Sequence, residues 1–134
     1  MKYHIITIGK IKEKYLTAGI DEFLKRLRPY GQVEITALPE EKMPDNPSEA
    51  QKRQVLEKEG EKMLRHVRQG SYVFVLELTF IIGGPFGLSD GVRRRADSRI
   101  SFGRITLTHQ MIRMILLEQI YRAVKIQRHE PYHW

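Results

Sequence analysis

Residues 79–89 read Thr-Phe-Ile-Ile-Gly-Gly-Pro-Phe-Gly-Leu-Ser, and this stretch decides the fold. Its first four residues have the character of a buried strand, which ends abruptly on Gly83, Gly84 and Pro85. A strand that ends on glycines exposes backbone groups at the carboxyl end of a sheet, where ligands bind in open α/β proteins. Glycine also lets a ligand approach the backbone closely, because it has no Cβ. A tight turn without a ligand fits this stretch alone equally well.

Strand and helix patterns alternate on the amino-terminal side of this stretch. Residues 2–8 and 32–38 are rich in β-branched side chains and predict two strands. Apolar residues at helical spacing predict helices over about 15–28 and 48–69, and the second opens on a capping box. Residues 72–78 predict a third strand. This alternation is typical of a single α/β domain with a mainly parallel sheet flanked by helices, here over residues 1–134.

On the carboxyl-terminal side we expect a short helix over 90–97, a short strand over 98–102 and a final helix over 109–127. The final helix is apolar around most of its circumference, so it must be buried on nearly every side. In a small domain one side can cover the sheet, and the other side then needs a partner. We therefore predict a homodimer through this helix. A helix enclosed entirely by its own chain is the alternative.

The junction between Leu78 and Thr79 conflicts with this pattern. Residues 73–82 are almost continuously apolar and contain no turn signal. Two parallel strands need a crossover of about a dozen or more residues between them. A single strand of that length is possible but long. We predict that a segment is missing here and that the two residues are not joined in the working protein; a true deletion is the alternative.

The composition limits the partners. The net charge is +7, and eight of the nine basic residues after residue 70 are arginines, which suit phosphate and base recognition. Many basic proteins bind no nucleic acid, so charge alone is weak support. The absence of cysteine excludes disulfides and fits the cytoplasm. We expect no membrane span, and no metal site, because His129 and His133 lack further ligands.

Six stretches carry a resemblance to a known family, in order and over nearly the whole chain. They are residues 9–15, 57–60, 82–88, 101–110, 117–123 and 131–133. On these stretches the sequence resembles the bacterial ribosomal RNA large-subunit methyltransferase H family, which methylates N3 of a pseudouridine. That family belongs to the SPOUT, or α/β-knot, superfamily.

The resemblance implies a trefoil knot at the carboxyl end, a homodimer, and S-adenosylmethionine as the cofactor. It implies methylation of a pseudouridine in 23S ribosomal RNA, on free RNA or on the ribosome, at a site shared across the dimer. A ribosome- or RNA-binding protein that kept the fold without the chemistry is the alternative. Carried over residue by residue, the cofactor contacts fall on Leu76, Gly83, Phe102, Gly103, Arg104, Ile105, Thr106 and Leu107.

This chain departs from the family at three places. About two dozen residues are absent where Leu78 meets Thr79, next to the cofactor contacts. Thr108 stands where proline is usual, and Trp134 stands where a basic residue is usual. The first departure bears on activity, because it removes a crossover. The last removes one tail contact to RNA.

The chemistry implied is a direct displacement at a sulfonium methyl group, so the protein mainly aligns donor and nucleophile. The ring nitrogen also loses a proton, which a base or water must accept. Tyr132 and His133 in the tail are the candidate catalytic residues, and His133 is the better candidate for the proton. His109 is a further candidate, with capping or packing as its alternative, and Tyr132 can also simply pack on the domain. The expected RNA-facing residues are Arg93, Arg94, Arg95, Arg104, Lys125 and Arg128, although a basic helix is often only solvated.

Overall fold

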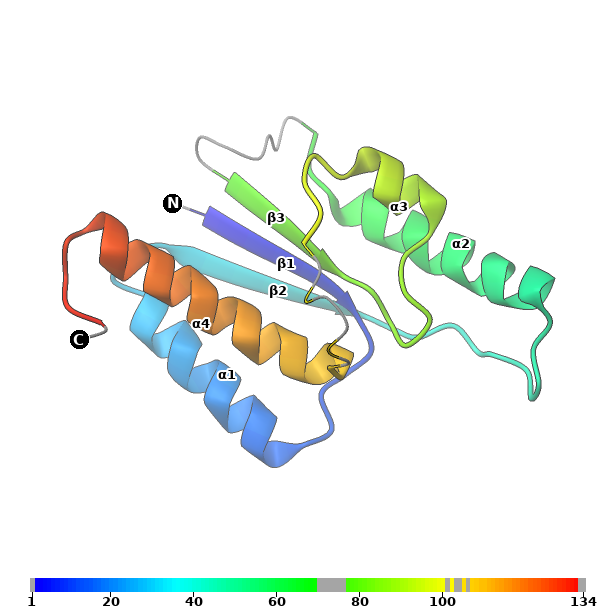
Figure 1. The fold of residues 1–134 in the computed structure, drawn as a ribbon, viewed down its shortest axis with the longest axis horizontal. Coiled ribbons are helices and arrows are strands. Elements are labelled where there is room, and N and C mark those ends of the chain that lie inside the picture. The colour runs from blue at the N-terminus through cyan, green and yellow to red at the C-terminus, as the bar shows by residue number, and fades with distance from the viewer. Residues whose placement is uncertain (1, 70–76, 101, 103–104, 106, 133–134) are drawn as a thin grey trace.

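Alternating strands and helices build three layers in the computed structural model, with a sheet between two pairs of helices (Figure 1). The structure describes residues 2–69, 77–100, 102, 105 and 107–132. Its elements are β1 (Lys2–Ile8), α1 (Lys14–Leu27), β2 (Gln32–Leu38), α2 (Glu49–His66), β3 (Glu77–Ile82), α3 (Asp90–Arg95) and α4 (His109–Gln127).

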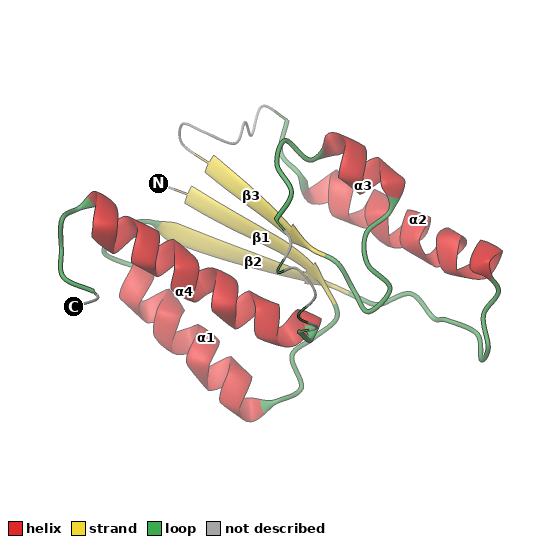
Figure 2. Ribbon diagram, viewed as in Figure 1, coloured by secondary structure: helices red, strands yellow, loops and turns green. Residues whose placement is uncertain are grey.

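The described strands form one parallel sheet in the order β2-β1-β3, which confirms the predicted architecture. Lys2 at the start of β1 pairs with Gln32 of β2 and with Glu77 of β3. Helices α1 and α4 cover one face of the sheet, and α2 and α3 cover the other (Figure 2). All three strands therefore end at the same edge, which we call the carboxyl edge.

The core has two parts because successive side chains of a strand point to opposite faces. On one face Tyr3 and Ile5 of β1 pack with Leu117 and Ile120 of α4. On the other face Ile6 and Ile8 pack with a second cluster, which contains Leu38, Met63 and Val92. Burial on both faces explains why β1 is so rich in isoleucine.

Hydroxyl side chains set the starts of three helices. Ser48 Oγ accepts a hydrogen bond from the Gln51 amide at 3.2 Å, and Gln51 Oε1 accepts one from the Ser48 amide at 2.9 Å, as the predicted capping box requires. Ser89 caps α3 through the Val92 amide. Thr108 caps α4 through the Met111 amide at 3.2 Å. Thr108 therefore stabilises the first turn of α4.

The predicted strand over 98–102 is wrong for its described residues, 98–100 and 102, which form no strand. They belong to the connection from α3 on one face of the sheet to α4 on the other (Figure 1). A segment that crosses between layers has no neighbouring strand to pair with, whatever its β-propensity. The expected knot would involve this same connection, where residues 101, 103–104 and 106 lie outside the described part, so the knot stays a prediction.

The prediction that Leu78 and Thr79 are not joined is also wrong, because β3 runs through both as one strand paired with β1. With no residues available for a crossover, Glu77–Ile82 takes the place beside β1. The strand expected over 72–78 is thus described only from Glu77 onward, and residues 72–76 lie outside the described part.

Helix α4 is covered by its own chain on one side. Leu117, Ile120 and Val124 are buried against α1 and the sheet. Ile115 is half-buried, and Ile126 is 64% exposed. Leu117 and Ile120 therefore face the core of their own subunit, and a charge at either position would disrupt the fold rather than a dimer interface.

We expect Leu117→Ala to lower the free energy of unfolding by about 2–5 kcal/mol. The Leu117 side chain is fully buried beside β1, so its truncation leaves a cavity there. Gln119→Ala, on the exposed side of the same helix, is the matched control and should change it by less than about 0.5 kcal/mol. Urea unfolding followed by circular dichroism measures both. Equal effects would contradict the placement of α4.

Candidate functional site

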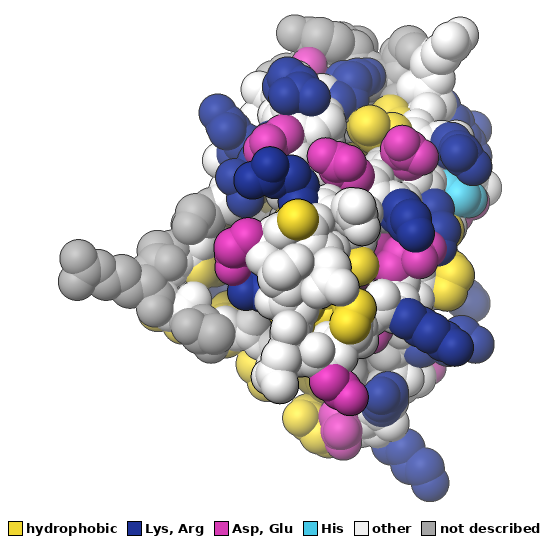
Figure 3. Space-filling model, turned by 90° about the vertical axis from the view of Figure 1, so that its right-hand side faces the viewer, with side chains coloured by type: hydrophobic (Ala, Val, Ile, Leu, Met, Phe, Trp, Pro, Cys, Tyr) yellow, Lys and Arg dark blue, Asp and Glu magenta, His cyan; other side chains and the backbone are white. Residues whose placement is uncertain are grey.

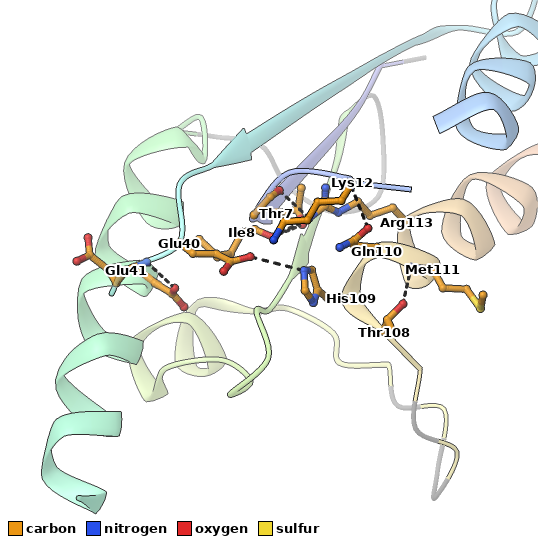
Figure 4. Close-up of polar contacts among 12 residues, drawn as sticks. Thr7, Ile8, Lys12, Glu40, Glu41, Thr108, His109, Gln110, Met111 and Arg113 are labelled. Atoms are coloured by element: carbon orange, nitrogen blue, oxygen red, sulfur yellow. Dashed lines mark hydrogen bonds and ion pairs between the residues drawn. The ribbon is translucent and has the colours of Figure 1, made fainter. Parts of the chain in front are cut away.

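The turn after β1 leaves room for the carboxylate of Glu40 at the carboxyl edge. Gly9 has a φ of 81°, a left-handed conformation that favours glycine, and its amide donates to the Leu38 carbonyl at 2.8 Å. A Cβ on Gly9 would collide with the carboxylate of Glu40. The glycine therefore lets Glu40, two residues after β2, lie across the end of β1 (Figure 4).

A buried arginine joins α4 to the same edge. Arg113 is 1% exposed, and its Nη2 donates to the carbonyls of Ile8 at 2.6 Å and Gly9 at 2.8 Å. Its Nε has no partner among the described residues. Burial lowers the pKa of the guanidinium. Sequence reasoning missed Arg113; the available signal was a lone arginine in an otherwise apolar stretch, one helical turn after His109.

The first turn of α4 places two more polar side chains beside Arg113. Gln110 Oε1 accepts a hydrogen bond from the Lys12 amide at 3.2 Å. His109 has a side chain that is 17% exposed, and its Nε2 lies 3.9 Å from Glu40 Oε1 (Figure 4). Burial and the charge of Arg113 lower the pKa of His109, and Glu40 acts in the opposite direction.

A second carboxylate is buried on the other side of the edge. Glu59 of α2 is 5% exposed, and its Oε1 accepts from the Glu41 amide at 3.1 Å. Burial is the main cause that raises the pKa of this carboxyl. Next to it lies a hollow of about 360 Å³, lined by Glu40, Glu41, Lys42, Met43, Glu59, Pro85 and Phe86. The hollow is thus acidic on one side and apolar on the other.

The glycines after β3 form a tight turn. Gly87 donates its amide to the Gly84 carbonyl at 3.1 Å. A Cβ on Gly83 would lie 2.5 Å from the Gly87 carbonyl oxygen and 3.1 Å from a Leu88 methyl carbon, whereas one on Gly87 would meet nothing within 4 Å. Gly83 is therefore required by its own turn, which is the alternative that the sequence left open.

The other expected cofactor contacts are described only in part. Phe102 and Ile105 are exposed, and Leu107 is half-buried just before α4. Leu76, Gly103, Arg104 and Thr106 lie outside the described residues. Phe86 in the glycine turn after β3 is exposed as well.

The structure does not bring the expected RNA-facing residues into one surface of a single chain. Arg93, Arg94 and Arg95 are exposed on α3, and Arg95 pairs with Asp97 at 3.4 Å. Lys125 lies at the end of α4, on the opposite face of the sheet, and its Nζ donates to Glu130 at 2.6 Å. The Arg128 guanidinium lies 4.9 Å from the centre of the Tyr30 ring.

The tail folds back along the carboxyl-terminal half of α4. The Tyr132 hydroxyl donates to Glu118 Oε1 at 3.0 Å, and the ring meets that of Tyr121 edge-on at 5.0 Å. Burial is the main cause that raises the pKa of Tyr132. His133 lies outside the described residues. The contacts of Tyr132 lie on Glu118 and Tyr121, roughly 14–18 Å along the helix from His109 at about 1.5 Å per residue.

The described residues contain neither a metal-ligand cluster nor a membrane-spanning helix. No group of three or more histidines or acidic residues there could hold a metal ion. No helix in that part of the chain is long and apolar enough to cross a membrane.

Comparisons with known proteins agree on one family. The family model described as "Predicted SPOUT methyltransferase" matches residues 1–79 and 75–133. The chain is 44% identical to the ribosomal RNA large subunit methyltransferase H of Enterococcus faecalis and 47% identical to that of Halothermothrix orenii, each over 158 positions. It is 45% identical to that of Symbiobacterium thermophilum over 160 positions. Each comparison covers 99% of both chains.

The comparisons also locate the missing segment. Alignments of 158 positions against a chain of 134 residues leave at least 24 positions without a counterpart here. The two matches of the family model meet at residues 75–79, which contain the junction of Leu78 with Thr79. The chain therefore lacks a segment that these relatives contain at that junction.

The family model matches nearly the whole chain, and the parallel sheet with its two helical layers agrees with that match. The chain therefore belongs to the SPOUT methyltransferase family, which is a family of transferases.

Proposed function

We propose that this protein uses S-adenosylmethionine to methylate N3 of a pseudouridine in 23S ribosomal RNA, as a homodimer in the cytoplasm. The observation that carries the proposal is the identity of 44–47% over 99% of the chain to three proteins named ribosomal RNA large subunit methyltransferase H. Relatives this similar over their whole length favour a shared substrate class.

The proposed cofactor contacts are the glycine turn at Gly83 and residues 102–107, together with Leu76. Phe102 and Ile105 are exposed apolar side chains in the segment before α4, and a bound adenosyl group would cover them. The bound cofactor would supply an electrophilic methyl group on a positively charged sulfur. The chain's own part is to hold the donor in line with the nucleophile and to exclude water.

The position of the tail supports a shared site. Tyr132 packs against Glu118 and Tyr121, roughly 14–18 Å along α4 from His109 at about 1.5 Å per residue, so it lies away from the carboxyl edge of its own subunit. A two-fold axis that pairs two α4 helices in opposite directions would place one tail beside the partner's carboxyl edge. We therefore assign Tyr132 and His133 to substrate placement in the partner's site. The exposed Ile126 and half-buried Ile115 are the candidate contacts between the helices.

The RNA surface would also extend across two subunits. The three arginines of α3 lie on one face of the sheet and Arg128 follows α4 on the other, so a dimer would let one RNA contact both sets without wrapping around a subunit. Lys125 would have to leave Glu130 to contact RNA, and Arg128 is the stronger candidate of the two. On the face shown in Figure 3, Lys and Arg side chains alternate with Asp and Glu, so charge alone selects no site there.

One observation favours the second candidate, an RNA-binding protein without the chemistry. Glu77 pairs with Lys2 at the amino edge of the sheet, whereas Gly83 follows β3 at the carboxyl edge. The strand between them spans roughly 20 Å at about 3.3 Å per residue. The cofactor contacts expected beside Glu77 and at Gly83 can share one pocket only if a crossover segment lies between them, so that both fall at the same edge of the sheet.

A titration of the protein with S-adenosylmethionine, followed by calorimetry, separates the two candidates. We expect saturable binding of one molecule per subunit, and transfer of a labelled methyl group to the 23S RNA of ribosomes that lack the modification. Enzymatic digestion and mass spectrometry would locate the label on N3 of a pseudouridine. Binding of RNA without binding of the cofactor would support the second candidate instead.

Gly83→Ala should weaken cofactor binding at least about tenfold, because its Cβ must displace the Gly87 carbonyl and so distort the turn. Gly91→Ala on α3 is the matched control, since a Cβ there meets nothing closer than 3.8 Å. Calorimetry gives the affinities, and circular dichroism checks that both variants fold. Equal affinity for the two variants would remove the turn from the cofactor site.

Truncation after Glu130 should leave the dimer and the cofactor affinity nearly unchanged and remove methyl transfer. Tyr132 contacts Glu118 and Tyr121 at the surface of α4, so its loss opens no core. Light scattering, calorimetry and the labelled-methyl assay measure the three properties. Transfer at the full-length rate would mean that the tail only packs on α4.

A further inference from the structure

The carboxyl edge holds a histidine and a carboxylate that the proposed function does not yet use. His109 Nε2 is buried, has no hydrogen-bond partner among the described residues, and faces Glu40 Oε1 at 3.9 Å. That distance is too long for a hydrogen bond but suits an ion pair once the imidazole is protonated. The arrangement thus favours a histidine that is neutral at rest and gains a partner when it takes up a proton.

Methylation at N3 needs such a group. The nitrogen of a uracil ring carries a proton that must leave as the nitrogen attacks the methyl group, and a positioned base assists that step. Resting on the proposed function, we infer that His109 accepts the N3 proton of the target base and that Glu40 orients His109 and stabilises its protonated form.

Three elements hold this pair in place. Thr108 caps α4 and fixes the backbone of His109 at the first turn. Gly9 leaves the space that the Glu40 carboxylate occupies. Arg113, one turn further along α4, is bound to the carbonyls of Ile8 and Gly9 and keeps the helix against the end of β1. His109 is therefore positioned by the first turn of α4, and Glu40 is positioned by the turn after β1.

The surrounding charges keep His109 ready to accept a proton. The charged groups that act on it are Arg113 on its own helix and Glu40 after β2. Burial and Arg113 lower the pKa of His109, which favours the neutral ring. A neutral ring with its proton on Nε2, toward Glu40, leaves the lone pair of Nδ1 for the substrate.

In the transfer, the bond from N3 to the methyl carbon forms as the bond from sulfur to that carbon breaks. The electron pair of the broken bond stays on sulfur, which becomes a neutral thioether. The N3 proton passes to Nδ1 of His109, and the imidazolium next to Glu40 later releases it to water. In this scheme His133 of the tail places the base and does not take its proton.

The first test is the pH dependence of methyl transfer with saturating cofactor. The wild-type rate should fall at low pH with a midpoint below 6.5, because the base must be neutral. H109N should lower the rate about 100-fold or more and should abolish this fall at low pH, which we call the acid limb. E40Q should lower the rate and move the limb to lower pH, since it removes the charge that raises the pKa of His109.

Matched controls distinguish this role from a loss of structure. H66N alters an exposed histidine on α2, and E22Q alters an exposed carboxylate on α1; both should keep the wild-type rate and limb. If H133N, rather than H109N, removes the acid limb, the inference is overturned. Absence of transfer by the wild type, with or without cofactor binding, counts against the proposed function and not against the pair.

The second test needs no activity. Titration of imidazole signals by NMR in the unliganded protein should give His109 a pKa below 6.5 in the wild type and a lower one in E40Q. An R113M variant that folds should raise it, because a nearby positive charge is removed. A His109 pKa that E40Q does not move would overturn the pair, whatever the activity of the enzyme.

Discussion

The hydrogen bonds from Arg113 to the carbonyls of Ile8 and Gly9 are the contact on which the carboxyl edge depends. A buried cation is costly unless it is well hydrogen-bonded, and strand ends offer carbonyls that no ladder satisfies. The guanidinium meets both needs at once, because it lies where β1 ends and α4 begins. Removing it would take this donor from the buried Gly9 carbonyl and leave the Ile8 carbonyl with the 3.4 Å bond from the Thr7 hydroxyl. It would also release the first turn of α4, which carries His109 and Gln110.

Much of the fold could be predicted because hydrophobic periodicity reports burial. The strands at Lys2–Ile8 and Gln32–Leu38 and the helix at His109–Gln127 lie where the sequence pattern indicates. The strand expected over 98–102 does not form, since a pattern of β-formers says nothing about whether a neighbouring strand exists. The sequence pattern could not predict the role of Arg113 either, because its hydrogen-bond partners lie more than 100 residues away in sequence.

The candidate site shows the same limit. The glycines after β3 could equally serve a ligand or a turn, and the sequence does not say which atom occupies the space of a missing Cβ. In the structure the Gly87 carbonyl occupies it at Gly83, and the Glu40 carboxylate occupies it at Gly9. Both glycines are therefore explained by packing within the chain, and each places a polar group at the carboxyl edge. Glu40 itself carries no motif that would distinguish it from the other acidic residues around it.

The missing crossover constrains how such a site can be built here. A parallel strand that ends at one edge can be followed by another only if the chain returns to the opposite edge, and this chain has no residues for that return at Leu78–Thr79. One strand then occupies the place beside β1. Any pocket at the carboxyl edge must use the ends of β1, β2 and β3 and the start of α4, where Glu40 lies against Gly9 and 3.9 Å from His109. The proton transfer proposed for His109 and Glu40 uses residues of this edge, whereas the cofactor contacts expected at Leu76 and Gly83 can share one pocket only with a crossover between them.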